Sequence, residues 1–206
     1  AANWTLEWVG FLPGKRESRS HIGDHLLTQN DVRAEGRFDD LVAYGGWPMD
    51  DHHPAGMRWK NEPTTFHGAP SPYGIPYRCL YSRGIGNLFF AGRNISVTHA
   101  ALSSTRVIAT CGIIGQAVGT AAAIAVRDGL SPRGVHEKRI GELQQTLMAD
   151  DCHLPWQVRA VPELTRRARL GASEGDPEIL RNGVDRPTGN ADNAWTGVAG
   201  TGWVQY

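Results

Sequence analysis

Asn-Leu-Phe-Phe-Ala-Gly-Arg-Asn occupies residues 87–94, and an apolar run rich in alanine and glycine follows from Val107 to Val126. The first five residues of the quoted stretch are typical of a short buried strand that ends before Gly92. The later run indicates a helix that continues to about Arg127, because Gly129 stands where a helix C-terminus favours glycine. A strand, a loop and a helix in this order predict an α/β fold.

The residues before the predicted helix are suited to an anionic ligand. Ser103, Ser104 and Thr105 can cap its N-terminus, and Arg106 would add a positive charge in the first turn. Free amide groups at such a terminus stabilise negative charge on a ligand. Small residues along the helix would let it approach a sheet or a ring closely: Gly112, Gly115, Gly119 and Ala122. The same small residues also suit plain packing in a buried αβ unit.

The composition indicates a packed protein without a strongly charged partner. Of its 206 residues 40% are apolar, and 21 basic residues balance 21 acidic ones. No basic run marks a nucleic-acid surface. The glycines and Gln116 in Val107–Val126 favour a buried helix over a membrane span. The three cysteines and the groups around His21, His25 and residues 50–53 give no metal-ligand spacing, so no metal site is predicted.

The rest of the first 156 residues is predicted to hold several short elements. A short helix is capped near Thr28, and a longer helix follows Ser131. The proline-rich segment from Trp47 to Pro76 indicates a covering loop with a function. The remaining expected elements are strands at Leu6–Leu12 and Tyr77–Tyr81, a helix or strand at Phe38–Tyr44, and the longer helix at Val135–Met148.

The composition changes after Pro162. Short strand-like runs alternate with turns such as Asn182-Gly183, and Trp195 and the final residues 203–206 add aromatic strand signals. This tail resembles the opening of a discoidin-like, galactose-binding β-sandwich. We therefore predict three parts: residues 1–156, a linker at 157–166, and an incomplete β-sandwich at 167–206.

Three segments carry a more specific resemblance. They are Pro-Gly-Lys-Arg-Glu-Ser-Arg at 13–19, Tyr-Gly-Gly-Trp-Pro-Met-Asp at 44–50, and Ala-Gly-Arg-Asn-Ile-Ser-Val-Thr-His-Ala-Ala-Leu-Ser-Ser-Thr-Arg-Val-Ile-Ala-Thr-Cys at 91–111, which continues into Gly-Gln-Ala-Val-Gly-Thr-Ala-Ala-Ala at 115–123. In order and spacing they resemble the FAD-dependent oxidoreductase family, some members of which carry the label xanthan lyase. The resemblance implies the C-terminal portion of a Rossmann-like FAD domain with substrate-domain segments.

The same resemblance implies roles for individual residues. Gly92, Arg93 and Asn94 would line the FAD, and the helix from Thr105 would point at its isoalloxazine ring, where reduction places negative charge. The Gly-x-Gly-x-x-Gly that seats the pyrophosphate in this family does not occur in these 206 residues. We therefore expect it in a preceding N-terminal half of the same protein, as the partner of this chain.

His99 is the candidate for proton transfer at the flavin, since a histidine titrates near neutral pH; a histidine that only hydrogen-bonds its loop is the alternative. Arg16 and Arg19 flank Glu17 and are candidates to hold the substrate or to form a structural ion pair. The predicted reaction is hydride transfer from a small-molecule substrate, with a carbohydrate or another polyol among the candidates. A carbohydrate-binding or polysaccharide-degrading protein is the alternative.

Overall fold

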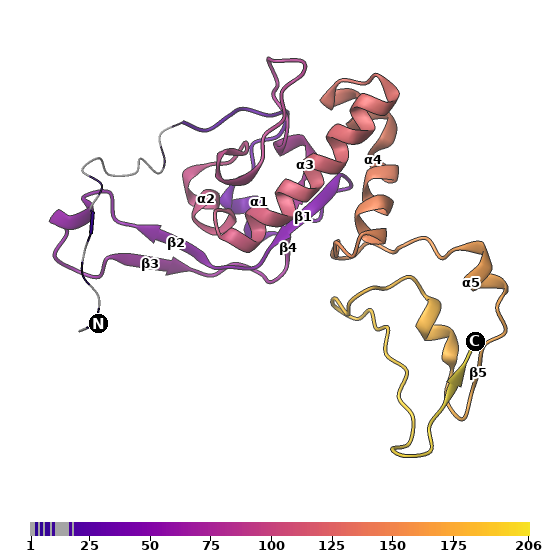
Figure 1. Cartoon of the computed structure of the whole chain (residues 1–206). Coiled ribbons are helices and arrows are strands. Elements are labelled where there is room, and N and C mark those ends of the chain that lie inside the picture. The colour runs from indigo at the N-terminus through magenta and orange to yellow at the C-terminus, as the bar shows by residue number, and fades with distance from the viewer. Residues whose placement is uncertain (1–2, 4, 6, 9, 11–16, 18) are drawn as a thin grey trace.

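A pair of long helices, α3 (Ile108–Asp128) and α4 (Pro132–Ala149), lies against a small sheet in the computed structural model (Figure 1). The structure describes residues 3, 5, 7, 8, 10, 17 and 19–206. The sheet pairs β1 (Leu41–Gly45) with β4 (Tyr73–Pro76) in antiparallel register. Helices with small sheets are consistent with the expected α/β fold, while the Rossmann-like arrangement stays a prediction.

Both long helices end within one residue of their predicted ends, whereas both start elsewhere: α4 begins at Pro132, three residues before the predicted Val135. Gly129 ends α3 in the left-handed conformation with φ 63°, and the Ser131 side chain caps α4, which begins at Pro132. Tyr77 Oη donates a hydrogen bond of 2.9 Å to the Pro132 carbonyl. Gln144 donates to the Leu41 carbonyl at 3.0 Å, so α4 is fastened to β1.

The start of α3 differs more from the prediction. The serines and threonine expected to cap it lie instead inside a separate helix, α2 (His99–Thr105), which Thr98 caps. Val107, in extended conformation, precedes α3, and its side chain makes no cap hydrogen bond. The prediction that Ser103, Ser104 and Thr105 cap the long helix was therefore wrong.

One face of α3 is buried and the other is exposed. Ile114, Ala117 and Ala121 are completely buried in the core, whereas Ile108 and Val126 are almost fully exposed. Among the described helices, α3 alone is long and apolar enough to cross a membrane, and 33% of its most apolar window is buried. The prediction that this helix is buried is therefore confirmed for one of its faces and not for the other.

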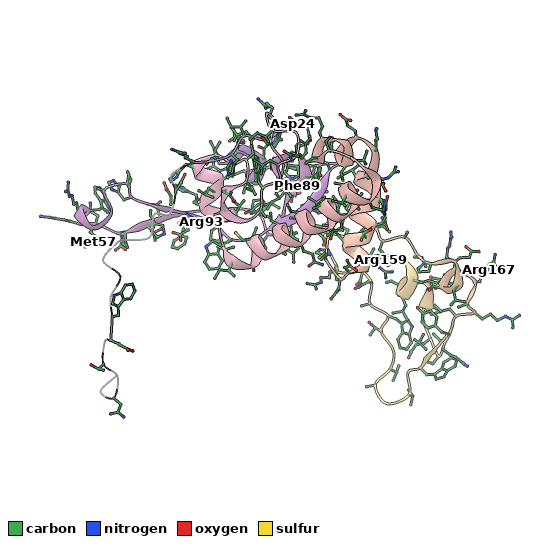
Figure 2. All side chains as sticks on the ribbon, turned by 45° about the horizontal axis from the view of Figure 1, so that its top comes forward. Asp24, Met57, Phe89, Arg93, Arg159 and Arg167 are labelled. Atoms are coloured by element: carbon green, nitrogen blue, oxygen red, sulfur yellow. The ribbon has the colours of Figure 1, made fainter. Side chains whose placement is uncertain are left out.

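The segment from Trp47 to Pro76 is more regular than its prolines suggested. A hairpin of β2 (Met49–His52) and β3 (Thr64–His67) extends from the body, and β4 follows it. Figure 2 shows Met57, within the short 3-10 helix η1 (Gly56–Arg58), at the far end of this hairpin and away from the core.

Among the other short elements, the helix α1 is present as predicted, whereas two predicted strands are absent or shortened. The cap expected near Thr28 is present at α1 (Gln29–Arg33), where Thr28 and Asp31 form a capping box. The strand expected at Tyr77–Tyr81 was wrong, because Tyr77–Cys79 forms the 3-10 helix η2. The strand expected at Asn87–Ala91 shortens to one bridge between Phe89 and Tyr81. Most of the expected strand at Leu6–Leu12 lies outside the described residues.

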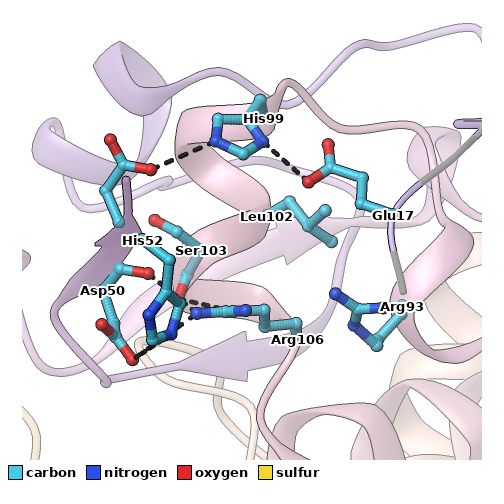
Figure 3. A pocket seen from close by; sticks show the side chains of 9 residues that line it. Glu17, Asp50, His52, Arg93, His99, Leu102, Ser103 and Arg106 are labelled. Atoms are coloured by element: carbon cyan, nitrogen blue, oxygen red, sulfur yellow. Dashed lines mark hydrogen bonds and ion pairs between the residues drawn. The ribbon is translucent and has the colours of Figure 1, made fainter. Parts of the chain in front are cut away.

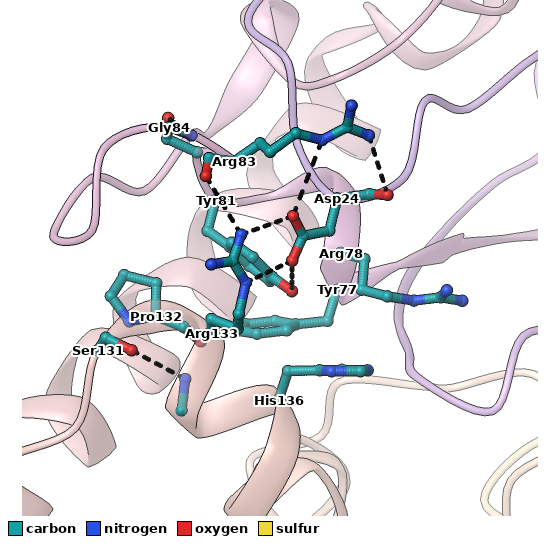
Figure 4. A network of polar contacts seen from close by, with 12 residues as sticks. Asp24, Tyr77, Arg78, Tyr81, Arg83, Gly84, Ser131, Pro132, Arg133 and His136 are labelled. Atoms are coloured by element: carbon teal, nitrogen blue, oxygen red, sulfur yellow. Dashed lines mark hydrogen bonds and ion pairs between the residues drawn. The ribbon is translucent and has the colours of Figure 1, made fainter.

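A polar network holds the segment before α1 on the start of α4 (Figure 4). Both carboxylate oxygens of Asp24 accept from the Arg133 guanidinium at 2.7 Å, and Tyr81 Oη donates to Asp24 at 2.9 Å. The hydrogen bond from Arg133 is the main reason that the pKa of the Asp24 carboxyl lies below its usual value.

The tail contains α5 (Glu163–Arg167), β5 (Gly171–Ala172), the 3-10 helix η4 (Pro177–Arg181) and β6 (Val204–Gln205). The side chain of Gln145 on α4 bonds the backbone of Val158 and Ala160 at 3.1 and 2.7 Å. Arg159 in turn pairs with Asp185 at 2.9 Å. The Gln145 side chain thus connects α4 to the backbone of the segment that leads into the tail. The β-sandwich and the domain boundaries stay predictions.

Replacing Gly45 with alanine is expected to lower the free energy of unfolding by about 1–3 kcal/mol, because overpacking displaces a buried ring. A Cβ at Gly45 would stand 2.3 Å from Tyr73 Oη, and Tyr73 is completely buried. Urea unfolding measures the change. Gly68→Ala is the matched control, since its Cβ would meet no atom within 4 Å. Equal stabilities of the two variants would contradict the prediction.

Candidate functional site

A pocket of about 140 Å³ opens where four segments of the chain meet (Figure 3). Glu17 comes from the N-terminal segment, Arg93 from the 3-10 turn η3 (Gly92–Asn94), and the other side chains from β2 and α2. The lining residues are Glu17, Asp50, Asp51, His52, Arg93, His99, Leu102, Ser103 and Arg106.

Local helix geometry sets the floor of the pocket. The Thr98 side chain accepts a hydrogen bond from the backbone N–H of Ala101, which starts α2 with His99 as its first residue. His99, Ser103 and Arg106 then follow at four- and three-residue spacing, so their side chains lie along one face of the helix. Sequence reasoning named all three but did not predict the helix that aligns them.

His99 stands between two carboxylates. Its Nδ1 lies 2.7 Å from Glu17 Oε2, and its Nε2 lies 3.1 Å from Asp51 Oδ1. Only the imidazolium form donates from both nitrogens. The hydrogen bond to Glu17 is the main reason that the pKa of His99 lies above its usual value. The hydrogen bond to Asp51 also raises this pKa, whereas burial lowers it. His99 is therefore set up as a cation, although 64% of its side chain is exposed.

Arg106 interacts with Asp50 on the neighbouring strand β2. Its Nη2 donates to the Asp50 carbonyl at 2.8 Å and lies 3.5 Å from the Asp50 carboxylate. Asp50 also accepts a short hydrogen bond from the Thr64 hydroxyl and lies 3.5 Å from His52 Nε2. The sequence placed Arg106 in the first turn of the long helix; it instead follows α2 and pairs with β2.

Arg93 is the cation of the pocket that has no acidic partner in the described part of the chain. Its Nε is buried and makes no hydrogen bond to any described residue. Burial raises the pKa of the thiol of Cys111, the fourth residue of α3, and the charge of Arg93 partly offsets this rise. Arg93 thus lies between the pocket and the start of α3.

Of the two serines and Thr105, Ser104 connects α2 to the rest of the chain. Ser103 Oγ donates to the Ala100 carbonyl at 2.6 Å. Ser104 Oγ donates to the Trp47 carbonyl and lies 2.5 Å from Tyr73 Oη, while burial raises the pKa of Tyr73 to about 12. Thr105 is buried as well. Ser104 and Thr105 therefore contribute to packing beneath the pocket.

The remaining predicted residues are placed as follows. Arg19 is exposed and does not line the pocket, and Arg16 lies outside the described residues. Glu17, which the two arginines flank, provides the pocket contact. Gly92 has a positive φ of 81°, and Asn94 is exposed beside it. Within the described ranges no group of three acidic, histidine or cysteine side chains is arranged to hold a metal ion.

Sequence reasoning missed the roles of Asp50, Asp51 and Glu17. Asp51 lies 48 residues before His99, and Glu17 lies 82 residues before it. The available signals are the resembling segments at 13–19 and 44–50, which contain Glu17 and Asp50, and the Asp-Asp-His-His run at 50–53.

Comparison with known families gives one match. A family model described as FAD dependent oxidoreductase matches residues 1–147 of the 206. No curated protein and no solved structure matches the chain. The matched range contains all three resembling segments and the whole pocket. The tail lies beyond the match, so its discoidin-like resemblance stays a prediction. By this match, the chain belongs to the FAD dependent oxidoreductase family.

Proposed function

We propose that this chain forms the flavin-contacting and substrate-binding part of an oxidoreductase that moves a hydride between a small molecule and FAD. The observation that carries the proposal is the position of the pocket. Arg93 and His99 line it, and η3, the turn that carries Arg93, packs against α3. Family membership favours this function over a purely carbohydrate-binding role.

The start of α3 fits an electron-rich ligand. Its first-turn amides have no side-chain cap among the described residues, and no acidic residue lies in that turn. A helix of 21 residues presents partial positive charge there. Bound FAD would supply the hydride acceptor, and these amides would stabilise the negative charge that the ring gains on reduction. Gly92 and Asn94 and the main chain of Arg93 would line the cofactor.

The exposed face of α3 fits close contact with a ring or a sheet. A Cβ added at Gly112, Gly115 or Gly119 would meet no atom within 4 Å. We propose that the dinucleotide-binding N-terminal half of the same protein packs on this face. Burial of Ile108 and Val126, which are almost fully exposed, would then stabilise the assembly.

The charge on His99 decides how protons move in the pocket. An imidazolium already holds its proton and cannot take up a second one. Both of its N–H groups are engaged by Glu17 and Asp51, so a substrate oxygen would take the place of one of these carboxylates as the acceptor. Glu17 and Asp51 are then the proton acceptors. In oxidation of an alcohol, the hydroxyl proton passes to one of these carboxylates as the hydride leaves the carbon. His99 stabilises the negative charge that develops on the oxygen.

A flavin-retention experiment tests the proposal in the full-length protein. After incubation with FAD and desalting, the wild-type protein is expected to keep the visible absorbance of bound flavin. Gly112→Leu should lose it, because the new side chain would fill the open face of α3. Gly141→Leu in α4 is the matched control, since it is also an open helical glycine.

Both leucines replace glycine inside a helix and favour helix formation by the same amount. Loss of flavin from Gly112→Leu alone therefore reports the face of α3 and not a weakened helix. A wild-type protein that kept no flavin after this treatment would overturn the proposed function.

A further inference from the structure

We propose that Arg93 binds the carboxylate of the substrate, so that the enzyme acts on a small carboxylate-bearing alcohol or carbonyl compound. This inference rests on the proposed function and names its substrate class. It starts from the charges that line the pocket. Three carboxylates and three cationic side chains line it when His99 is protonated.

Each acidic side chain of the pocket already has a cationic partner. Glu17 and Asp51 share His99, at 2.7 and 3.1 Å. Asp50 lies 3.5 Å from Arg106, and its other contacts are Thr64 and His52. A substrate amine would have to displace one of these partners. The acidic residues therefore do not make the pocket selective for a cation.

Arg93 differs from the other two cations. It has no hydrogen bond or ion pair with a described residue, and the residues outside the described part include no Asp or Glu. A guanidinium stays charged at every physiological pH. Its Nε is buried without a hydrogen-bond partner among the described residues, which is unfavourable unless a ligand supplies the acceptor. A pocket ligand meets this charge without displacing a protein partner.

The chemistry of arginine selects a planar anion. Two parallel N–H groups match the two oxygens of a carboxylate, and charge-assisted hydrogen bonds are about twice as strong as neutral ones. A cavity of about 140 Å³ is well below the roughly 300–1,000 Å³ of sites for drug-sized ligands. It therefore accommodates the reacting end of a small acid rather than several sugar rings. The carboxylate at Arg93 would orient the neighbouring hydroxyl or carbonyl in the pocket that His99 also lines.

Binding of glycolate and of its neutral analogue glycolamide to the full-length protein tests the inference without any turnover. Calorimetric titration is expected to show glycolate binding about tenfold or more tighter than glycolamide, which is the effect of about 1.4 kcal/mol from a charge-assisted contact. Arg93→Gln should remove this preference, and Arg93→Lys should restore part of it. Arg58→Gln, at an exposed arginine of η1, is the control that should retain it.

Several outcomes would overturn the inference. Equal binding of glycolate and glycolamide to the wild-type protein would do so, whatever the fate of the variants. So would a preference that survives in folded Arg93→Gln, or tighter binding of inorganic phosphate than of glycolate. If prior loading with FAD abolished glycolate binding, Arg93 would belong to the cofactor. The proposed function fails by a different measurement, namely when the wild-type protein keeps no flavin absorbance after incubation with FAD and desalting.

Discussion

Replacing His99 with glutamine is expected to lower kcat of the flavin-loaded protein by about 10²–10³-fold, the usual cost of losing one group that stabilises a developing oxyanion. Glutamine can keep one hydrogen bond to Glu17 or Asp51 but carries no charge. The substrate oxygen would lose the cation that stabilises it. Steady-state rates with a carboxylate-bearing alcohol measure the effect, and an unchanged kcat would remove His99 from the site.

The pH profile separates this role from simple packing. Two carboxylates raise the pKa of His99, so the charged form persists above the ordinary value of about 6.5. Activity that needs this charge is present below the raised pKa and falls as pH rises through it. Glu17→Gln removes the larger of the two hydrogen-bond contributions, so the fall should move to lower pH while Asp51 still accepts the proton. A profile that did not move would contradict the assignment.

The same linkage acts on stability. Because the pKa of His99 is higher in the folded chain, its stabilising contribution is fully present below the unfolded value and is lost as pH rises through the folded one. This contribution is small, since His99 is largely exposed to solvent and to salt screening. The catalytic effect of His99→Gln should therefore far exceed its effect on unfolding.

Local sequence signals predicted those parts of the fold that local chemistry determines. The cap at Thr28 and the C-terminal Gly129 depend on neighbouring residues alone, and both were predicted. The break between α2 and α3 was missed, because neither glycine nor proline marks Arg106 and Val107. A serine and threonine run before an apolar stretch is typical of a cap, and here burial of Ser104 against Tyr73 overrides that preference.

The candidate site was predicted only in part, because it depends on contacts between distant segments of the chain. His99 and Arg93 lie within the resembling segment from 91 to 111 and were named from it. Their chemical state depends on Glu17 and Asp51, which reach the pocket from distant segments. Neither periodicity nor spacing reports a contact across 82 residues. The charge of His99 therefore became evident only from the folded chain.

Replacing Asp40 with alanine is expected to lower the free energy of unfolding by about 3 kcal/mol, the lower end of the range for a broken buried ion pair. The Asp40 side chain is 4% exposed and accepts from the Arg78 backbone N–H, from its Nε and from its Nη2 at 3.0, 3.0 and 3.1 Å. The lower end applies because Arg78 is 36% exposed, so water can solvate its guanidinium after the change. Urea unfolding of the full-length protein measures the loss.

Two variants distinguish the ion pair from the mere presence of an aspartate in this loop. Asp40→Asn keeps an acceptor for the Arg78 N–H but removes the charge, so its loss should be intermediate. Asp39→Ala changes the exposed neighbour, whose contact with Gln144 uses only the backbone carbonyl, and should stay within about 0.5 kcal/mol of wild type. If Asp40→Ala matched Asp39→Ala, the pair would not stabilise the fold. Because Arg78 follows β4 and Asp40 precedes β1, the expected loss would show that this pair closes the end of the sheet on which α3 packs.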